Sequence, residues 1–168
     1  MKKIGEYVVY RKQVCKVVDI LKNYLDDKDY YSLVPITDQS LCLKVMATDN
    51  NSYIRDLISK DEIEVIIKKI PEIEIITKDE RSLEAEYKEL LKNGTWEELI
   101  KIIKTTYLRN KTRIDSHKKV SDKDSYYFEL AEKYLYNEFA IVLGMTYNET
   151  KNYIIEKLQG QEVENDIR

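Results

Sequence analysis

The sequence predicts an α+β protein in which a small β-sheet precedes a bundle of helices. Short runs of β-branched and aromatic residues, separated by charged or turn-forming residues, occupy positions 6–46, as expected for strands. From about residue 62 onward, apolar residues recur instead at the three- and four-residue spacing of helices. A length of 168 residues allows two small domains, and we place them at 1–72 and 73–168.

Four strands are predicted in the first domain. Residues 5–10 and 14–20 form one hairpin, and its charged connection at 11–13 contains no Asn-Gly or Gly-Gly pair, so the turn type stays open. Residues 29–36 and 40–46 form a second pair. Four strands this short are expected to be stable only as a compact, strongly bent sheet of the Tudor or SH3-like barrel kind.

Two helices and a linker are predicted after the sheet. The turn formers at 49–52 precede a short helix at 53–58. Isoleucines then recur at helical spacing, which predicts a helix at 62–70 that Pro71 ends. Residues 72–77 alternate only weakly and predict an extended linker or a short strand.

The second domain is predicted to consist of four helices. Asp79 caps the first, which covers 80–92 and ends at Gly94 in a left-handed C-cap position. Thr95 and Glu98 form a capping box at the start of the second helix. Its apolar face is expected to consist of Trp96, Leu99, Ile100, Ile103 and Tyr107.

The later helices are separated by polar or glycine-containing segments. The second helix of this domain is predicted to fade near Arg109, and a basic connection follows at 110–120. The third helix covers 121–143, and the fourth starts at Thr146. The tail at 159–168 has no apolar period, so we expect it to fray.

The two cysteines and the single histidine bear on redox chemistry and metal binding. Cys15 and Cys42 both lie in predicted strands, and we expect free thiols buried in the sheet rather than a disulfide. There is no Cys-x-x-Cys spacing and His117 is the only histidine, so we expect neither a zinc site nor a cofactor. We also find no Gly-rich phosphate loop and no catalytic cluster of side chains, and we expect the protein not to be an enzyme.

Two features bear on localisation. The longest uncharged run, at 139–148, is far shorter than the roughly 20 apolar residues that a membrane span needs. Lys2 and Lys3 are followed by Gly5 and Glu6 rather than by the apolar segment of a secretory signal. We therefore expect a cytoplasmic protein that makes no membrane contact, and we expect it to be a monomer.

The net charge of −3 conceals a basic window at 101–123. Counting Lys and Arg against Asp and Glu, this window carries +6, whereas 71–100 and 124–168 each carry −5. Its basic residues are Lys101, Lys104, Arg109, Lys111, Arg113, Lys118, Lys119 and Lys123. They could converge on one edge of the bundle and bind phosphate oxygens, or they could form only a solvated surface. The sequence alone favours neither alternative.

The order of several short motifs resembles a known family. Gly5-Glu6-Tyr7-Val8-Val9-Tyr10 is followed by the hairpin strand 14–20, then by Tyr30-Tyr31, Leu43-Lys44-Val45 and Tyr53-Ile54-Arg55. The segments at 87–94 and 131–140 continue the similarity in the helical part. From about Ile4 to Leu158 the chain resembles the CarD family of bacterial transcription regulators. Its N-terminal RNA-polymerase-interacting domain also occurs in the transcription-repair coupling factor.

The resemblance implies that the N-terminal domain binds the β subunit of RNA polymerase. The family's contact residues fall on the strand at 41–45 and near the end of the preceding hairpin. Lys44 matches a basic position of the family, and Asn23 or its neighbour Lys22 occupies the other. Cys42 and Val45 lie on the same strand as Lys44, so we include them in the expected polymerase-binding surface. A lysine on an edge strand can also serve only to prevent aggregation.

The resemblance also implies that the helical domain lies against upstream promoter DNA and stabilises the open complex. We expect DNA contacts from Arg81, Lys88, Arg109, Lys111, Arg113, Lys118 and Lys119. Many family members insert a tryptophan into the minor groove near the position of Glu80, where this chain has none. Trp96 lies one helix later, on a face expected to pack inward. Tethering is therefore the better-supported role, and the acidic flanks predict that contact with free DNA is weak.

Two alternatives stay open at this level. The protein could be an adaptor whose helical domain docks a protein and never touches DNA. Much less favoured is an enzyme with an unrecognised site. The salt dependence of promoter-complex binding separates the regulator from the adaptor, because phosphate contacts release counterions and protein docking largely does not.

Overall fold

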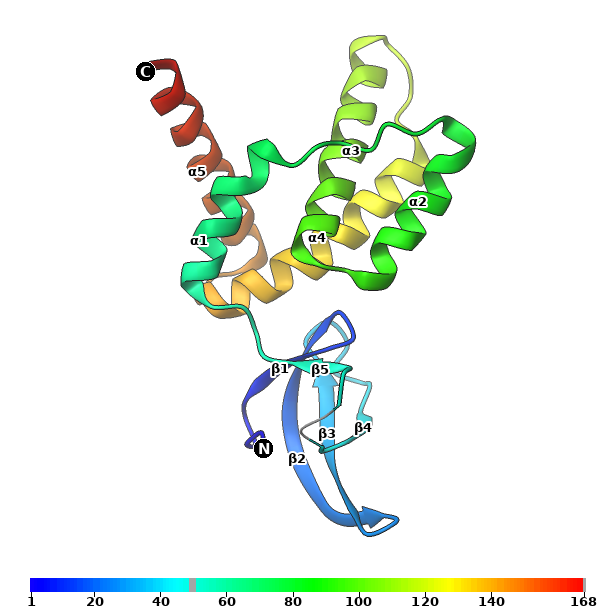
Figure 1. Cartoon of the computed structure of the whole chain (residues 1–168), viewed down its shortest axis with the longest axis vertical. Helices are drawn as coiled ribbons and strands as arrows, with labels where there is room; N and C mark the ends of the chain where they lie inside the picture. The colour runs from blue at the N-terminus through cyan, green and yellow to red at the C-terminus, as the bar shows by residue number, and fades with distance from the viewer. Residues whose placement is uncertain (49–50, 168) are drawn as a thin grey trace. The chain divides into compact units, whose positions relative to one another are not determined.

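The computed structural model describes residues 1–48 and 51–167, with side chains described as far as Gly160. Over these residues the protein is α+β, with a five-stranded antiparallel sheet followed by five α-helices (Figure 1). The chain forms two compact units, residues 1–58 and residues 59–168, which we call the sheet unit and the helical unit.

The sheet has the strand order β4-β3-β2-β1-β5, and every neighbouring pair is antiparallel. The strands are β1 (Tyr7–Tyr10), β2 (Gln13–Leu25), β3 (Lys28–Pro35), β4 (Leu43–Met46) and β5 (Ile54–Arg55). The first four correspond to the predicted strands and pair as predicted. In this order β4 and β5 are the two edge strands of the sheet.

The β1–β2 connection is tighter than its sequence suggested. Tyr10 pairs with Gln13, which leaves Arg11 and Lys12 as a two-residue turn. Arg11 has a φ of 58°, which is the left-handed backbone conformation that turns of this length need. Residues other than Gly, Asn and Asp rarely adopt this conformation. Arginine thus occupies a turn position that glycine, asparagine or aspartate usually fills.

Strand β2 is long and bulged. Its pairing with β3 shifts between Val17 and Asp19 and again between Leu21 and Leu25. Bulges of this kind bend a strand and increase its twist. Asn23 lies within the second irregularity and has a left-handed φ of 46°.

Asp26 and Asp27 close the β2–β3 hairpin. Leu25 pairs with Lys28, and both aspartates have positive φ values, 51° and 56°. Two consecutive left-handed residues are the requirement of the type I′ hairpin turn, and aspartate tolerates this conformation better than most residues. This acidic pair therefore forms the turn between β2 and β3.

One face of the sheet carries the core of the sheet unit. Its buried members are Val8, Cys15, Val17, Tyr31, Leu33 and Val45, and Tyr10, Ile20, Leu43, Ala47 and Ile54 pack around them. They come from all five strands and the residue after β4. The alternation of strand side chains brings them to one side.

The predicted short helix at 53–58 is wrong. Ile54 and Arg55 instead form β5, which pairs with Tyr10 and Val9 of β1. Ile54 also packs against the sheet core, so a long-range pairing outweighs the local preference. Of the turn formers at 49–52, Asp49 and Asn50 lie outside the described residues. Asn51 donates through Nδ2 to the carbonyl of Met46 and accepts through Oδ1 from the Tyr53 amide, at 3.0 Å each.

The expectation of two buried thiols is half correct. Cys15 lies in the core, but Cys42 lies just before β4 and is exposed. Burial raises the pKa of the Cys15 thiol to about 11, which keeps it protonated at neutral pH.

We expect the two thiols to react with Ellman's reagent in two separate phases. Cys42 should react at once in the folded protein, and Cys15 only after denaturant exposes it. The Cys42→Ser variant should lose the fast phase alone. Two fast thiols in the wild-type protein would contradict the burial of Cys15.

The helical unit begins with α1 and contains all the remaining helices. They are α1 (Lys60–Lys69), the 3₁₀ turn η1 (Ile70–Glu72), α2 (Glu80–Asn93), α3 (Trp96–Asp115), α4 (Asp122–Leu143) and α5 (Tyr147–Ile167). The predicted capping box of α3 is present, and Gly94 and Gly144 end α2 and α4 with left-handed φ values of 61° and 65°. Helix α5 continues to Ile167, beyond residue 159 where fraying was predicted.

Helix α1 belongs to the helical unit, so the division of the chain falls at residues 58 and 59 rather than near residue 72. Ile63, Ile66 and Ile67 are its buried residues, and it packs against α4 and α5. Glu64 accepts a hydrogen bond from the hydroxyl of Tyr153 on α5. These contacts bring the helix into the bundle, although a linker of seven residues follows η1.

Helix α3 is longer than predicted because of an unusual C-terminal cap. His117 has a left-handed φ of 58°. Its amide donates to the carbonyl of Ile114 at 3.0 Å, and the Lys118 amide donates to the carbonyl of Arg113 at 2.8 Å. This is the hydrogen-bond pattern of the Schellman motif, with histidine at the position that glycine usually occupies.

The buried face of α3 also differs from the prediction at its C-terminal half. Ile102, Thr105 and Thr106 are buried, whereas Tyr107 is exposed. The two threonines donate their hydroxyls to carbonyls of the preceding turn, so their burial leaves no hydroxyl without a partner. Trp96 is half-buried, with the Lys69 ammonium 5.8 Å from the ring centroid.

Lys104 and Thr105 hold the predicted linker against α3. The ammonium of Lys104 donates to the carbonyls of Ile70 and Ile73 at 2.9 and 2.5 Å, and the amide of Ile76 donates to Thr105 Oγ1 at 2.9 Å. Burial lowers the pKa of Lys104. Lys104 therefore satisfies carbonyls at the end of η1 and is not a freely available cation of the basic window.

Candidate functional site

The first candidate surface is the outer edge of β4. This strand pairs with β3 on one side, from Leu33↔Leu43 to Tyr30↔Met46, and within residues 1–48 and 51–58 no strand pairs with its other side. Lys44 and the preceding Cys42 are exposed. Backbone amides and carbonyls along such an edge can add a strand from a partner protein.

Of the residues predicted for polymerase binding, Val45 does not reach this surface with its side chain. It is 7% exposed and belongs to the sheet core. Only its backbone can contribute to edge pairing, and the prediction of Val45 as a side-chain contact is corrected in this respect. Neighbouring residues of a strand point to opposite faces, so Lys44 and Val45 cannot both point outward.

Lys44 also has a role within the sheet. Its ammonium donates to Ser32 Oγ at 2.5 Å, and Ser32 is paired with Lys44 across the strands and is 1% exposed. The lysine therefore covers a buried hydroxyl as well as presenting a charge at the edge. A replacement at position 44 has to be judged together with a measurement of stability.

Lys22 and Asn23 lie in the second irregularity of β2, where Asp29 holds both. The Lys22 ammonium and the Asn23 amide donate to the two carboxylate oxygens at 2.7 and 3.1 Å. These hydrogen bonds, that of Lys22 first, hold the pKa of Asp29 below its usual value. The pair lies on the part of the hairpin beyond Leu21↔Tyr30, which is also the level at which β4 ends.

The second candidate surface lies at one end of the helical unit, where a charged cluster joins α2, α3 and α4. Asp124 is fully buried and accepts hydrogen bonds from the Tyr87 hydroxyl and from Arg109 Nε, each at 2.9 Å. Arg109 also donates to Glu80, and Lys123 lies 3.3 Å from the same carboxylate. The hydrogen bonds from Arg109 and Lys123 lower the pKa of Glu80.

This cluster changes the role of Arg109. Its side chain is 28% exposed and is paired with two carboxylates, one of them buried. Arg109 was predicted to contact DNA, but it binds Asp124 and Glu80 within the bundle. Two of its three guanidinium nitrogens, Nε and Nη2, are thus engaged by carboxylates of the bundle.

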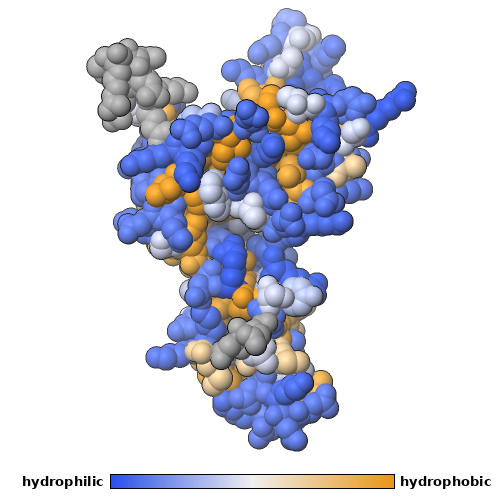
Figure 2. All heavy atoms as spheres, viewed as in Figure 1, coloured by the Kyte–Doolittle hydropathy of each residue, from blue (hydrophilic) through white to orange (hydrophobic). Residues whose placement is uncertain are grey.

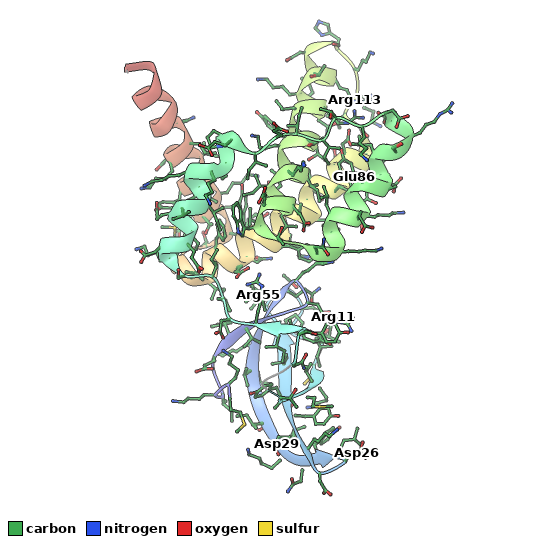
Figure 3. The ribbon with its side chains drawn as sticks, viewed as in Figure 1. Arg11, Asp26, Asp29, Arg55, Glu86 and Arg113 are labelled. Atoms are coloured by element: carbon green, nitrogen blue, oxygen red, sulfur yellow. The ribbon has the colours of Figure 1, made fainter. Side chains whose placement is uncertain are left out.

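The cluster brings together the first turn of α2, the last part of α3 and the start of α4 (Figure 1). We call the five basic residues near this junction the basic end. They are Arg81 on α2, Lys111 and Arg113 on α3, and Lys118 and Lys119 in the connection to α4. Arg113, labelled in Figure 3, is half-buried, and the others are exposed. None of the five forms an ion pair with a residue that the structure describes.

Lys88 is set apart from the basic end. It lies about two turns further along α2, and its ammonium is 3.9 Å from Glu84. The structure thus brings together five of the seven residues predicted to contact DNA. Hydrophilic side chains also cover the end of α3 and the start of its connection on the face shown in Figure 2.

An open groove of about 500 Å³ runs between α3 and α4. Tyr107, Ile114 and Phe128 supply apolar walls. The groove is lined by two lysines, Lys111 and Lys151, and by two glutamates, Glu129 and Glu132. Because these charges balance, the groove does not favour a polyanion.

A third cluster escaped the sequence reasoning. The Arg11 guanidinium carbon lies 5.5 Å from the Tyr10 ring centroid and 5.1 Å from that of Tyr53. Figure 3 shows Arg11 and Arg55 toward one end of the sheet unit and Asp26 and Asp29 toward the other. The sequence contains no local motif for this cluster, because the β1–β5 pairing brings Tyr53 close to Tyr10 and Arg11.

Comparison with protein-family models and with curated proteins finds no match to this sequence. In the part of the chain that the structure describes, no group of three or more His, Cys, Asp or Glu side chains could hold a metal ion. None of the described helices combines the length and the apolar character needed to cross a membrane.

Proposed function

We propose that this protein is a transcription regulator of the CarD type, cytoplasmic and monomeric. Its sheet unit binds the β subunit of RNA polymerase through the edge of β4, and its helical unit contacts upstream promoter DNA and stabilises the open complex. The observation that carries the proposal is that the motif matched to the family's polymerase contact lies on an edge strand, with Lys44 exposed. A contact motif on a central strand would have no free edge to offer.

The architecture of the sheet unit supports the finer assignment to a Tudor or SH3-like barrel. The last strand returns to pair with the first, giving the order β5-β1-β2-β3-β4. The two irregularities in β2 bend the strand that has to pass from one side of a small barrel to the other. Six buried side chains from four strands fill its interior.

The basic end supports the contact with DNA. Five cations from two helices and a connection lie around one junction, which matches the electrostatic footprint of phosphate binding. The contact is of the backbone type, because Trp96 is half-buried beneath Lys69 and is not free to act as a wedge. The acidic segments on both sides keep affinity for free duplex low, so the tether on polymerase supplies the local concentration.

Polymerase binding is expected to depend on Lys44. Capture of core RNA polymerase by the full chain should weaken by at least one order of magnitude in the Lys44→Glu variant, since an opposed charge at a desolvated edge costs about 2–5 kcal/mol. Lys44→Gln should weaken capture less, because the amide can still donate to Ser32. The measurement is capture of core polymerase on immobilised protein, with the melting temperature recorded for each variant.

Lys16→Glu provides the matched control for Lys44→Glu. Lys16 is also an exposed lysine of the sheet, but it lies on the central strand β2 and should leave capture unchanged. If the wild-type chain captures no polymerase, the proposed function is wrong. If Lys44→Glu binds polymerase normally and melts normally, Lys44 serves only to protect the edge from aggregation.

The groove between α3 and α4 favours one alternative, an adaptor that docks a protein segment. Tyr107 and Ile114 are exposed on its wall by 56% and 59%, and aromatic and aliphatic anchors are common in protein interfaces. The adaptor would show little dependence on salt at the promoter, which separates it from the regulator.

A further inference from the structure

Arg11 is held in a defined position by two tyrosines. Its guanidinium carbon is within 6 Å of both ring centroids, the range in which a cation is attracted to an aromatic ring. Its amide donates to the carbonyl of Tyr53 at 2.8 Å, which ties the β1–β2 turn to the residue before β5. The turn, both rings and the cation thus form one connected unit on the surface.

The guanidinium keeps its hydrogen-bonding capacity. Arginine presents five N–H groups, and contact with rings leaves its edge free to bind two oxygens of an anion at once. No hydrogen bond or ion pair joins this guanidinium to a residue in the described part of the chain. Arg11 is exposed, and Tyr53 is 58% exposed, so a ligand can reach both.

The backbone of Arg11 is a second and independent observation. The left-handed residues other than glycine, over the described residues, are Arg11, Asn23, Asp26, Asp27 and His117. Asparagine and aspartate tolerate this conformation, whereas for arginine it stores strain of about 1 kcal/mol or more. Such strain concentrates at functional sites, because a glycine would fit the turn better if stability alone mattered.

We infer that Arg11, Tyr10 and Tyr53 form a binding site for single-stranded nucleic acid. The edge of the guanidinium meets a backbone phosphate, and the exposed face of Tyr53 stacks on a neighbouring base. Proteins that bind single strands combine cations with aromatic rings in this way. The site adds a nucleic-acid contact to the sheet unit and does not rest on the proposed polymerase binding, whose strand is at the other edge of the sheet.

An acidic protein segment is the competing ligand, and the exposed ring argues against it. A carboxylate would use the guanidinium alone and leave the open face of Tyr53 without a function. A nucleotide uses both, since its phosphate and its base are close neighbours. Lys12, next in the chain, is half-buried and burial lowers its pKa, so Arg11 supplies the exposed cation of the site.

The test is a titration of the isotopically labelled full chain with hexathymidylate at low salt, followed by nuclear magnetic resonance, which detects weak binding. The signals of Tyr10, Arg11 and Tyr53 should shift together. Arg11→Gln and Tyr53→Ala should each weaken binding by at least about fivefold, the lower end of the effect of losing one stacking contact. Arg11→Gln should also reduce the slope of log affinity against log salt by about 0.7.

Matched variants separate the site from general charge and folding effects. Lys16→Gln removes a cation that lies over one ring only, 5.9 Å from that of Tyr7, and should bind like wild type. Tyr53→Phe keeps the ring and should also bind like wild type. Arg11→Gly should melt at the same temperature or higher, because glycine accepts the left-handed turn, and should lose binding as Arg11→Gln does.

Three results would overturn the inference. The first is the absence of shifts with hexathymidylate, and the second is unchanged affinity in Arg11→Gln. The third is a stronger response of the same residues to a glutamate-rich peptide, which would make the site a protein-binding surface. Polymerase capture should be unaffected by Arg11→Gln, so a failure here leaves the proposed function standing, and loss of capture in Lys44→Glu leaves the inference standing.

Discussion

Replacement of Asp124 by Ala is expected to lower the free energy of unfolding of the helical unit by about 3 kcal/mol. Asp124 is fully buried and is the common acceptor for Tyr87 and Arg109. Without it, the Tyr87 hydroxyl has no acceptor in a site where burial and the neighbouring carboxylate already raise its pKa. Arg109 loses the buried one of its two carboxylates.

The size of this loss in unfolding free energy depends on the interactions that Arg109 keeps when Asp124 is removed. Removing one member of a fully buried ion pair costs about 3–5 kcal/mol. Arg109 is 28% exposed and keeps Glu80, so the effect should lie at the lower end of that range. Asp124→Asn retains an acceptor for one of the two donors and should cost about half as much.

Urea unfolding followed by helical circular dichroism measures this effect. Glu80→Gln is the matched control, because Glu80 belongs to the same cluster but its side chain is 58% exposed, and its loss should cost no more than about 1 kcal/mol. Equal effects of Asp124→Ala and Glu80→Gln would show that the buried carboxylate does not hold the three helices together.

Elements whose signals are local could be predicted from the sequence. The capping box of α3 needs only Thr95 and Glu98, three residues apart, and Gly94 and Gly144 mark helix ends by their own conformation. The four longer strands follow from runs of β-branched and aromatic residues. In each case the physical cause lies within a few residues.

The features that the sequence analysis did not predict depend on residues far apart in the sequence or on residues in unusual conformations. Strand β5 forms because β1 offers it an edge more than 40 residues away. The end of α3 was placed too early because His117 takes the left-handed role of a glycine. The ion pair between Arg109 and the buried Asp124 was not foreseen, because the two residues lie 15 positions apart on different helices.

In the candidate surfaces, too, features with local causes were predictable and features that depend on distant residues were not. The exposed position of Lys44 on a strand edge was predictable, and the period of two along β4 already implied that Val45 points inward. The gathering of Arg81 with Arg113 and Lys118 depends on how three helices meet. The contact of Arg11 with Tyr53 depends on the β1–β5 pairing, which the sequence analysis had replaced by a helix.

Replacing Lys111, Arg113, Lys118 and Lys119 together by Ala is expected to shorten the lifetime of the promoter open complex and to flatten its salt dependence. Each lost phosphate contact should reduce the slope of log affinity against log salt by about 0.9, so the full set reduces it by at most about 3.6. The loss should be similar for every promoter, because phosphates carry no base information.

Stability should hardly change in this variant. Lys111 and Arg113 lie on the last turns of α3, where Ala is the best helix former, and Lys118 and Lys119 are exposed in the connection. Capture of free core polymerase should also stay as it was, since these side chains belong to the helical unit. The variant therefore separates DNA contact from both folding and tethering.

The decisive comparison is with a second quadruple variant of equal charge. Lys60, Lys68, Lys92 and Lys133 are exposed lysines of the same unit outside the basic end, and their replacement by Ala lowers the net charge by the same four units. If the basic end meets phosphates, only the first variant changes the salt slope and the lifetime at several salt concentrations. If both variants act alike, the effect comes from overall charge. If neither acts, the helical unit does not touch DNA, and the groove between α3 and α4 becomes the surface to test with protein partners.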